Sequence, residues 1–90
     1  MHAVVVRATI GESDLAEKGL KERVLPRVKE APGLVAAYWT RSDDKTNGVA
    51  MIVFESEEAA RGAASMIGSA PPPETVTLDN VEVREVIANL

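Results

Sequence analysis

The side chains able to do chemistry are few, and their scarcity narrows the possible functions. The chain has no cysteine and one histidine, His2, near its start. A thiolate nucleophile, a cluster of histidine metal ligands and a histidine-based triad in the interior are therefore excluded. The adjacent carboxylates Asp43 and Asp44 lie in a polar stretch typical of a solvated turn, which does not suit paired acid–base catalysis. We expect no metal and no cofactor, and the sequence assigns no catalytic residue.

Arg7 is the most unusual charged residue, because its sequence neighbours are apolar. It follows Val4–Val6 and precedes Ala8 in a segment with the composition of a strand. Burying an unpaired guanidinium is very costly, so Arg7 must form an ion pair or line a polar pocket. Glu82 and Glu85 of the last predicted strand are candidate partners, and an anionic or carbonyl group of a ligand is the alternative. The sequence leaves both interpretations open.

Two aromatic residues, Tyr38 and Trp39, are adjacent in another predicted strand. Side chains alternate across a strand, so one of the two faces the helices and the other faces away. The sequence does not say which. Such aromatic residues either supply buried area in a core or interface, or stack on a ligand. Met66, a residue type that fills gaps in cores, is a further candidate for contact with a ligand.

Length and composition indicate one soluble domain spanning residues 1–90. The 46% of hydrophobic and 27% of charged residues are ordinary for a globular chain, and no apolar run approaches the ~20 residues of a membrane span. The formal charge of −4, without a basic stretch, argues against a nucleic-acid partner. The N-terminal segment lacks the features of a signal peptide, so we expect a cytoplasmic location.

Hydrophobic periodicity and turn residues predict six elements in the order βαββαβ. Pro26 predicts a kink or restart within the first helix, Ser56 is the expected N-cap of the second, and Pro71–Pro73 is an extended connector. The first helix is expected to begin at Asp14, with a capping box completed by Glu17, and to end at Pro32-Gly33. The second helix covers about residues 57–67. The predicted strands cover residues 1–10, 34–41, 49–54 and 76–87, the last of them at an edge, and a hairpin loop covers residues 42–48.

This order predicts a ferredoxin-like plait of the α+β class, a four-stranded antiparallel sheet with both helices on one face. Alternation along the first and third strands makes both faces of the sheet apolar. Two helices cover only one face, and a bare apolar face is unfavourable in a monomer. A domain of this size also buries only about 63% of its unfolded surface. We therefore expect a homodimer in which two sheets stack into a barrel.

Several short motifs resemble a known superfamily. They are Pro32-Gly33-Leu34, Tyr38-Trp39 and the run from Val53 to Ala59, in a βαββαβ chain of this length. The chain resembles the dimeric α+β barrels, specifically the antibiotic biosynthesis monooxygenase-like proteins, from about Met1 to Ile87. That superfamily includes cofactor-independent oxygenases of polycyclic aromatic compounds, haem-degrading enzymes and isomerases, so the resemblance does not decide the reaction. The haem-degrading branch uses an asparagine, a tryptophan and a histidine. The positions that match them hold Arg7, Phe54 and, approximately, Ala64, so all three residues differ and no histidine is available as a haem ligand. Haem degradation is therefore not expected.

The resemblance implies a ligand cavity between the sheet and the helices, into which Arg7 and Phe54 point together with Val5 and Ile52. It implies binding of a small aromatic or apolar molecule, with contacts from Arg7, Tyr38, Trp39, Phe54 and Met66.

Two alternatives stay open beside ligand binding. One is a cofactor-independent oxygenase of an electron-rich aromatic substrate, in which Arg7 stabilises an enolate or phenolate and Trp39 packs on the ring. The other is a non-catalytic assembly module, which the lack of an interior histidine and of cysteine favours.

Overall fold

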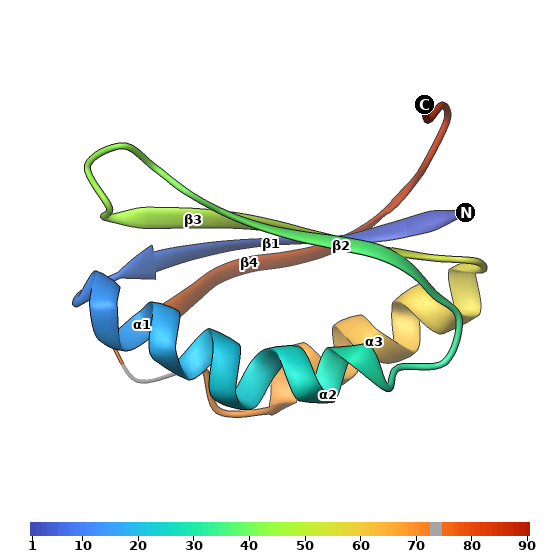
Figure 1. Cartoon of the computed structure of the whole chain (residues 1–90). Coiled ribbons are helices and arrows are strands. Elements are labelled where there is room, and N and C mark those ends of the chain that lie inside the picture. The colour runs from blue at the N-terminus through green and yellow to red at the C-terminus, as the bar shows by residue number, and fades with distance from the viewer. Residues whose placement is uncertain (73–74) are drawn as a thin grey trace.

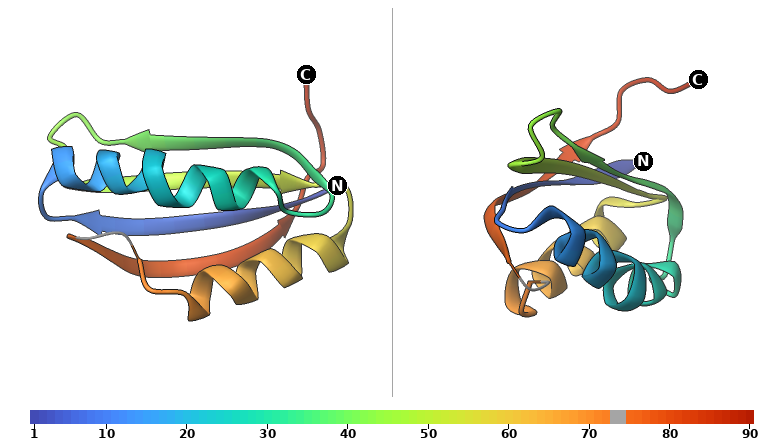
Figure 2. Two further views of the ribbon diagram at one scale, coloured as in Figure 1. Left: turned by 60° about the horizontal axis from the view of Figure 1, so that its bottom comes forward. Right: turned by 60° about the vertical axis from the view of Figure 1, so that its left-hand side comes forward.

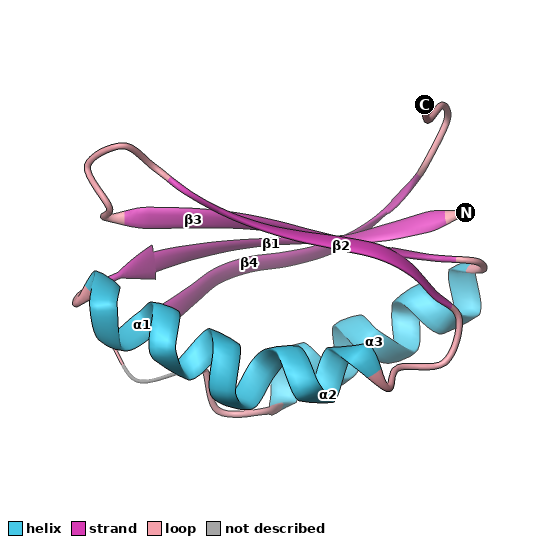
Figure 3. Ribbon diagram, viewed as in Figure 1, coloured by secondary structure: helices cyan, strands magenta, loops and turns pink. Residues whose placement is uncertain are grey.

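The computed structural model describes residues 1–72 and 75–90, and it has the predicted α+β architecture (Figure 1). Four strands form one antiparallel sheet in the order β2-β3-β1-β4, and the helices lie on one of its faces (Figure 3). This confirms the ferredoxin-like fold. The elements are β1 (His2–Ile10), α1 (Ser13–Gly19), a π-helical turn η1 (Leu20–Val24), α2 (Leu25–Lys29), β2 (Leu34–Arg41), β3 (Asn47–Phe54), α3 (Glu57–Ser69) and β4 (Val76–Glu85).

The core lies between the two central strands and α3. Val4 and Phe54 are the largest fully buried side chains, and Ala60 of α3 is buried against them. Ala59, Ala60, Ala63 and Ala64 give α3 the small-residue face that the sequence indicates, and such a face lets a helix lie close to a sheet. Ser56 caps this helix as predicted, since its Oγ accepts a hydrogen bond from the backbone N–H of Ala59 at 3.1 Å.

The first helical segment restarts near Pro26, as predicted. Proline has no N–H to donate and crowds the preceding turn, but it is tolerated in the first turn of a helix. Pro26 occupies that position in α2, and the turn before it widens into η1. The predicted capping box is wrong, because the helix begins at Ser13, its N-cap Glu12 makes no side-chain cap, and Glu17 binds elsewhere. The three pieces together run alongside α3 on the same side of the sheet (Figure 2).

Four other boundaries differ from the sequence-based ones by two or more residues. The first helical segment ends at Lys29 and not at Pro32-Gly33, β3 begins at Asn47, α3 continues to Ser69, and β4 ends at Glu85. After β4 one backbone hydrogen bond, from Val86 N–H to the Met1 carbonyl at 3.0 Å, extends the pairing of the chain ends (Figure 1). Pro73 of the predicted connector lies outside the described residues.

The loop between β2 and β3 is a hydrogen-bonded turn. Oδ1 of Asp44 accepts bonds from the Ser42 hydroxyl at 2.7 Å, the Thr46 hydroxyl at 2.7 Å and the Thr46 N–H at 3.1 Å. These donors, the Ser42 hydroxyl first, hold the pKa of the Asp44 carboxyl below its ordinary value of 3.8. Asp44 therefore stabilises the turn, as the polar composition of this loop predicts.

Candidate functional site

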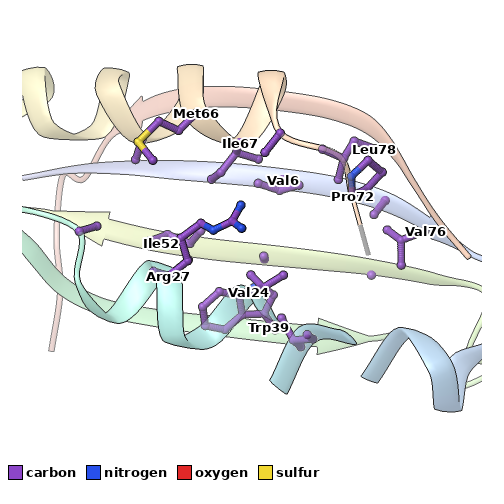
Figure 4. Close-up of a pocket in the computed structure, with 18 of the residues that line it drawn as sticks. Val6, Val24, Arg27, Trp39, Ile52, Met66, Ile67, Pro72, Val76 and Leu78 are labelled. Carbon is purple, nitrogen blue, oxygen red and sulfur yellow. The ribbon is translucent and has the colours of Figure 1, made fainter. Parts of the chain in front are cut away.

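A cavity of about 950 Å³ lies between the helix-facing side of the sheet and the helices. Its floor is made by the sheet, and the two helical segments form its walls (Figure 4). This volume is at the upper end of the range of about 300–1,000 Å³ that small-molecule sites occupy. Its lining is mostly apolar and includes Val6, Val24, Trp39, Ile52, Phe54, Met66, Ile67, Val76 and Leu78.

The cavity exists because the two helical segments meet the sheet differently. α3 places the completely buried Ala60 into the core. In the other segment, Leu20 and Val24 line the cavity instead of joining the buried core. Small residues on the floor, Gly48 and Ala50 of β3 among them, leave further room beneath the helices. A Cβ at Gly48 would lie 2.8 Å from the Thr40 carbonyl oxygen, so this position accepts no side chain without a shift of the backbone.

One end of the cavity is polar, and its charged side chains are linked to one another. Arg41, at the end of β2, donates from Nη1 to Oγ of Ser13 at 2.8 Å and to Oε1 of Glu17 at 3.1 Å. Nζ of Lys21 donates to the other oxygen of Glu17 at 2.9 Å. The bond from Lys21, and then the charge of Arg41, hold the pKa of Glu17 below its ordinary value of 4.5. Glu17 is thus a carboxylate shared by two cations.

A third cation, Arg27 of α2, lines the cavity in a different setting. Its side chain extends from α2 over the sheet, with Ile52 beneath it and α3 across from it (Figure 4). No carboxylate of residues 1–72 or 75–90 forms an ion pair with it. Glu30, one turn further along the chain, also lines the cavity. Arg27 is exposed overall, so solvent and an entering ligand can both reach its guanidinium.

Of the five ligand contacts that the resemblance implies, three line the cavity and two do not. Trp39 lies on the floor, Phe54 lies at one end of β3, and Met66 projects from α3. Tyr38 lies on the opposite face with 67% of its surface exposed, so it cannot contact a ligand in this cavity. The structure thereby answers the question left open by alternation, because Trp39 is the aromatic residue that faces the helices.

The prediction that Arg7 points into the cavity is wrong. Arg7 pairs with Val49 and Asn80 on the open face of the sheet and is exposed, whereas Phe54 pairs with His2 on the helix face. Neighbours in a strand alternate between faces, so the apolar residues on either side of Arg7 did not imply its burial.

The predicted partners of Arg7 are engaged elsewhere or lie too far along the strand. Glu82 accepts a bond from Nε of Arg84 at 2.8 Å, and Glu85 pairs with His2 at the other end of β1. Both interpretations of Arg7, as a buried ion pair and as an anchor inside the cavity, are therefore overturned.

His2 is held more firmly than its terminal position predicts. It pairs within the sheet with Phe54 and Glu85, and its Nδ1 is buried without a hydrogen-bond partner in the described part of the chain. Its charge contributes, after Arg61, to the lowered pKa of Glu57 at the start of α3. His2 does not line the cavity, so it is not available for proton transfer to a ligand there.

None of the charged residues that line the cavity belongs to the set predicted from the sequence; they are Glu17, Lys21, Arg27, Glu30 and Arg41. Helical periodicity carries a signal for Arg27, which follows Val24 by three residues and precedes Ala31 by four, and both of those line the cavity. Arg41 follows Trp39 by two residues and so shares its face of the strand. Both signals become useful only when it is known which side of the helix or strand faces the cavity.

Within residues 1–72 and 75–90 no group of three or more His, Asp or Glu side chains is arranged to hold a metal ion. None of the helices in that part of the chain is long and apolar enough to cross a membrane.

Neither the protein-family models nor the curated protein sequences include a match to this chain. Solved structures do match. SnoaB, a cofactor-independent oxygenase from Streptomyces nogalater, superposes with a TM-score of 0.75 at 22% identity, over 99% of this chain and 95% of that one. A monooxygenase from the ActVA-Orf6 gene of Streptomyces coelicolor, solved with Nanaomycin D, gives a TM-score of 0.60 at 20% identity, over 99% and 90% of the two chains.

A third match is a dimeric ferredoxin-like protein from an uncultured marine organism, with a TM-score of 0.62 at 11% identity over 100% of this chain and 98% of that one. At these identities the likeness concerns the fold. The chain therefore has the ferredoxin-like fold that these solved structures share, as its element order predicts.

Proposed function

We propose that the chain binds a small, flat, largely apolar molecule in the cavity between the sheet and the helices. The observation that carries this proposal is the 950 Å³ cavity itself, with Trp39 on its floor. A space of this size lined by aliphatic side chains stabilises a ligand through burial of apolar surface, at about 25 cal/mol per Å². The indole ring of Trp39 offers a flat surface for stacking against an aromatic ring.

Cofactor-independent oxygenation of such a ligand is the second candidate. The two matched oxygenases support it, since one is described as cofactor-independent and the other was solved with Nanaomycin D. In such a reaction a base first removes a proton from the substrate and cationic groups stabilise the enolate or phenolate. Arg27 and Arg41 suit the second role, but Glu17 is a weak base because its pKa is lowered. Ligand binding therefore ranks above oxygenation, and a purely structural module is the remaining alternative.

We place this function in a cytoplasmic homodimer that assembles through the open face of the sheet. On that face Tyr38 and Met51 are adjacent and are 67% and 46% exposed. Val5 continues the same row towards β4. Tyr38 and Met51 are the exposed members of this row, whereas Val5 is already buried. Exposed apolar side chains favour burial against a second sheet, and one matched structure is described as dimeric.

Trp39 also provides the test, because it is the only tryptophan in the chain. Titration with hydroxymethylanthracene, an uncharged three-ring probe, should quench Trp39 emission by energy transfer and reach saturation. The matched variants are Gly62→Leu and Gly68→Leu on α3. A Cβ at either glycine meets no atom within 4 Å, but only Gly62 lines the cavity.

We expect Gly62→Leu to weaken binding of the probe by about tenfold, because the added side chain occupies the space of the ligand. Gly68→Leu should leave the affinity unchanged. Quenching that does not saturate, or that both variants reduce equally, would contradict binding in the cavity and support the structural module. Oxygen uptake with hydroxyanthrones then decides between binding alone and oxygenation.

A further inference from the structure

We infer that the cavity selects ligands that carry an acidic group beside their apolar body, and that Arg27 binds this group. The inference rests on the proposed function, since it concerns the class of molecule that occupies the same cavity. Carboxylates and ionised phenols attached to aromatic rings have this chemistry. The argument depends on the charges that line the cavity, on their partners and on the position of Arg27.

The lining of the cavity has the opposite charge to the chain as a whole. Its charged members are the cations Lys21, Arg27 and Arg41 and the anions Glu17 and Glu30, which leaves one excess positive charge. The chain carries a formal charge of −4. A concave, mostly apolar site concentrates the field of the charges that line it, so this local excess favours an anion over a cation.

Arg27 is the cation of the lining that forms no ion pair with a described residue. Lys21 and Arg41 both donate to Glu17, so the donors of these two cations are engaged at the polar end, although one positive charge remains there. Arg27 has no ion-pair partner among the residues that the structure describes, and its donors are therefore free to bind a ligand. A guanidinium presents two parallel N–H groups that match the two oxygens of a carboxylate.

The position of Arg27 fits an amphipathic ligand. In Figure 4 the Arg27 side chain points from α2 towards α3, while Trp39 and Val6 belong to the strands that form the floor. A flat ring system can stack on the floor and direct its acidic substituent outwards to Arg27. Because Arg27 is exposed, the acidic group keeps part of its hydration and avoids the full cost of burying a charge.

The experiment compares two probes that differ only in charge, anthracene carboxylate and hydroxymethylanthracene. With the unmodified chain at low ionic strength we expect the carboxylate to bind about three- to tenfold more tightly, the effect of one charge-assisted contact that water partly screens. Arg27→Gln should abolish this preference and leave the affinity for the alcohol unchanged. Arg27→Lys should keep part of the preference, and added salt should reduce it.

Arg23→Gln is the matched control, because Arg23 lies in η1, carries the same charge and does not line the cavity. It should leave the preference intact. If both probes bind equally to the unmodified chain, or if Arg23→Gln lowers the preference as much as Arg27→Gln, the role of Arg27 is wrong while the cavity remains a ligand site. If neither probe binds, the proposed function itself fails.

Discussion

Glu17 connects three parts of the molecule through a single carboxylate. One of its oxygens accepts from Lys21 within the same helical segment, and the other accepts from Arg41 at the end of β2. The Arg41 guanidinium also binds the Ser13 hydroxyl at the start of α1. These bonds link the first helical segment to the sheet at the polar end of the cavity. They are partly exposed to water, so their energetic contribution is modest.

The lowered pKa of Glu17 predicts a pH dependence of stability. A carboxyl group whose pKa is lower in the folded than in the unfolded chain stabilises the fold above its ordinary value, here 4.5. This stabilisation is complete at neutral pH and is lost as the pH falls through the lowered value. Glu17→Gln should therefore lower the urea midpoint at neutral pH, and the difference from the unmodified chain should disappear in strong acid.

The control for this experiment is Glu22→Gln, which changes an exposed carboxylate of the same helical segment that forms no ion pair with a described residue. It should leave the midpoint unchanged at both pH values. A Glu17 effect of equal size in acid and at neutral pH would mean that the side chain acts through packing and not through its charge.

At the scale of elements, the stability of α3 depends on its N-terminus. The Ser56 hydroxyl satisfies one backbone N–H that the helix itself leaves free. Ser56→Ala should cost about 1 kcal/mol of unfolding free energy, which lowers the melting temperature by about 4–8 °C in a domain of this size. Ser65→Ala, within the same helix, removes a hydroxyl that makes no side-chain bond in the described structure and should have little effect. Equal effects of the two variants, measured by thermal unfolding, would rule out capping.

The elements themselves could be predicted because each has its own local signal. Alternation defined the strands, Ser56 marked the start of α3, and Pro26 marked the restart between η1 and α2. The cavity could not be predicted in this way. It depends on how far the first helical segment stands from the sheet, and that distance is set by many side chains at once and not by any local pattern.

The residues of the site also differ in whether a local pattern could reveal them. Phe54 is a predicted contact that does line the cavity, whereas alternation places Tyr38 and Trp39 on opposite faces without saying which of them faces the helices. Arg7 shares a face with Val5, and alternation alone does not reveal which face of β1 the helices cover, so the side of Arg7 is not predictable from its strand. Arg27 belongs to a helical segment with a π-turn and a proline, and this break obscures the periodic stripe that includes it.

At the scale of the whole molecule, the open face of the sheet determines the proposed assembly. Two apolar rows cross it, one through Tyr38, Met51 and Val5, and the other through Val53 and Ala3. Both rows end at β4 in the ion pair between Glu82 and Arg84. An apolar centre with a charged margin is the usual composition of a protein interface.

Met51→Glu should therefore dissociate the homodimer. A carboxylate in the middle of the apolar rows would lose its hydration on assembly, and we expect the dimer to weaken by about a hundredfold or more. Met66→Glu is the matched control, because it makes the same change at an exposed methionine on the helix side. Native mass spectrometry or sedimentation velocity gives the masses. A monomer before any substitution, or a dimer that survives Met51→Glu, would contradict assembly through this face.

The sheet order has a consequence for how the chain acquires its structure during synthesis. β1 lies in the centre of the sheet, yet both of its partners, β3 and β4, follow it in the chain. β1 leaves the ribosome before β3 and β4. Its second edge therefore stays unpaired until β4 has been synthesised. Its apolar residues Val4–Val6 are then exposed to other nascent chains or to chaperones. Translation that stalls before β4 would leave β1 with an unpaired edge, the feature of a strand that most readily leads to aggregation.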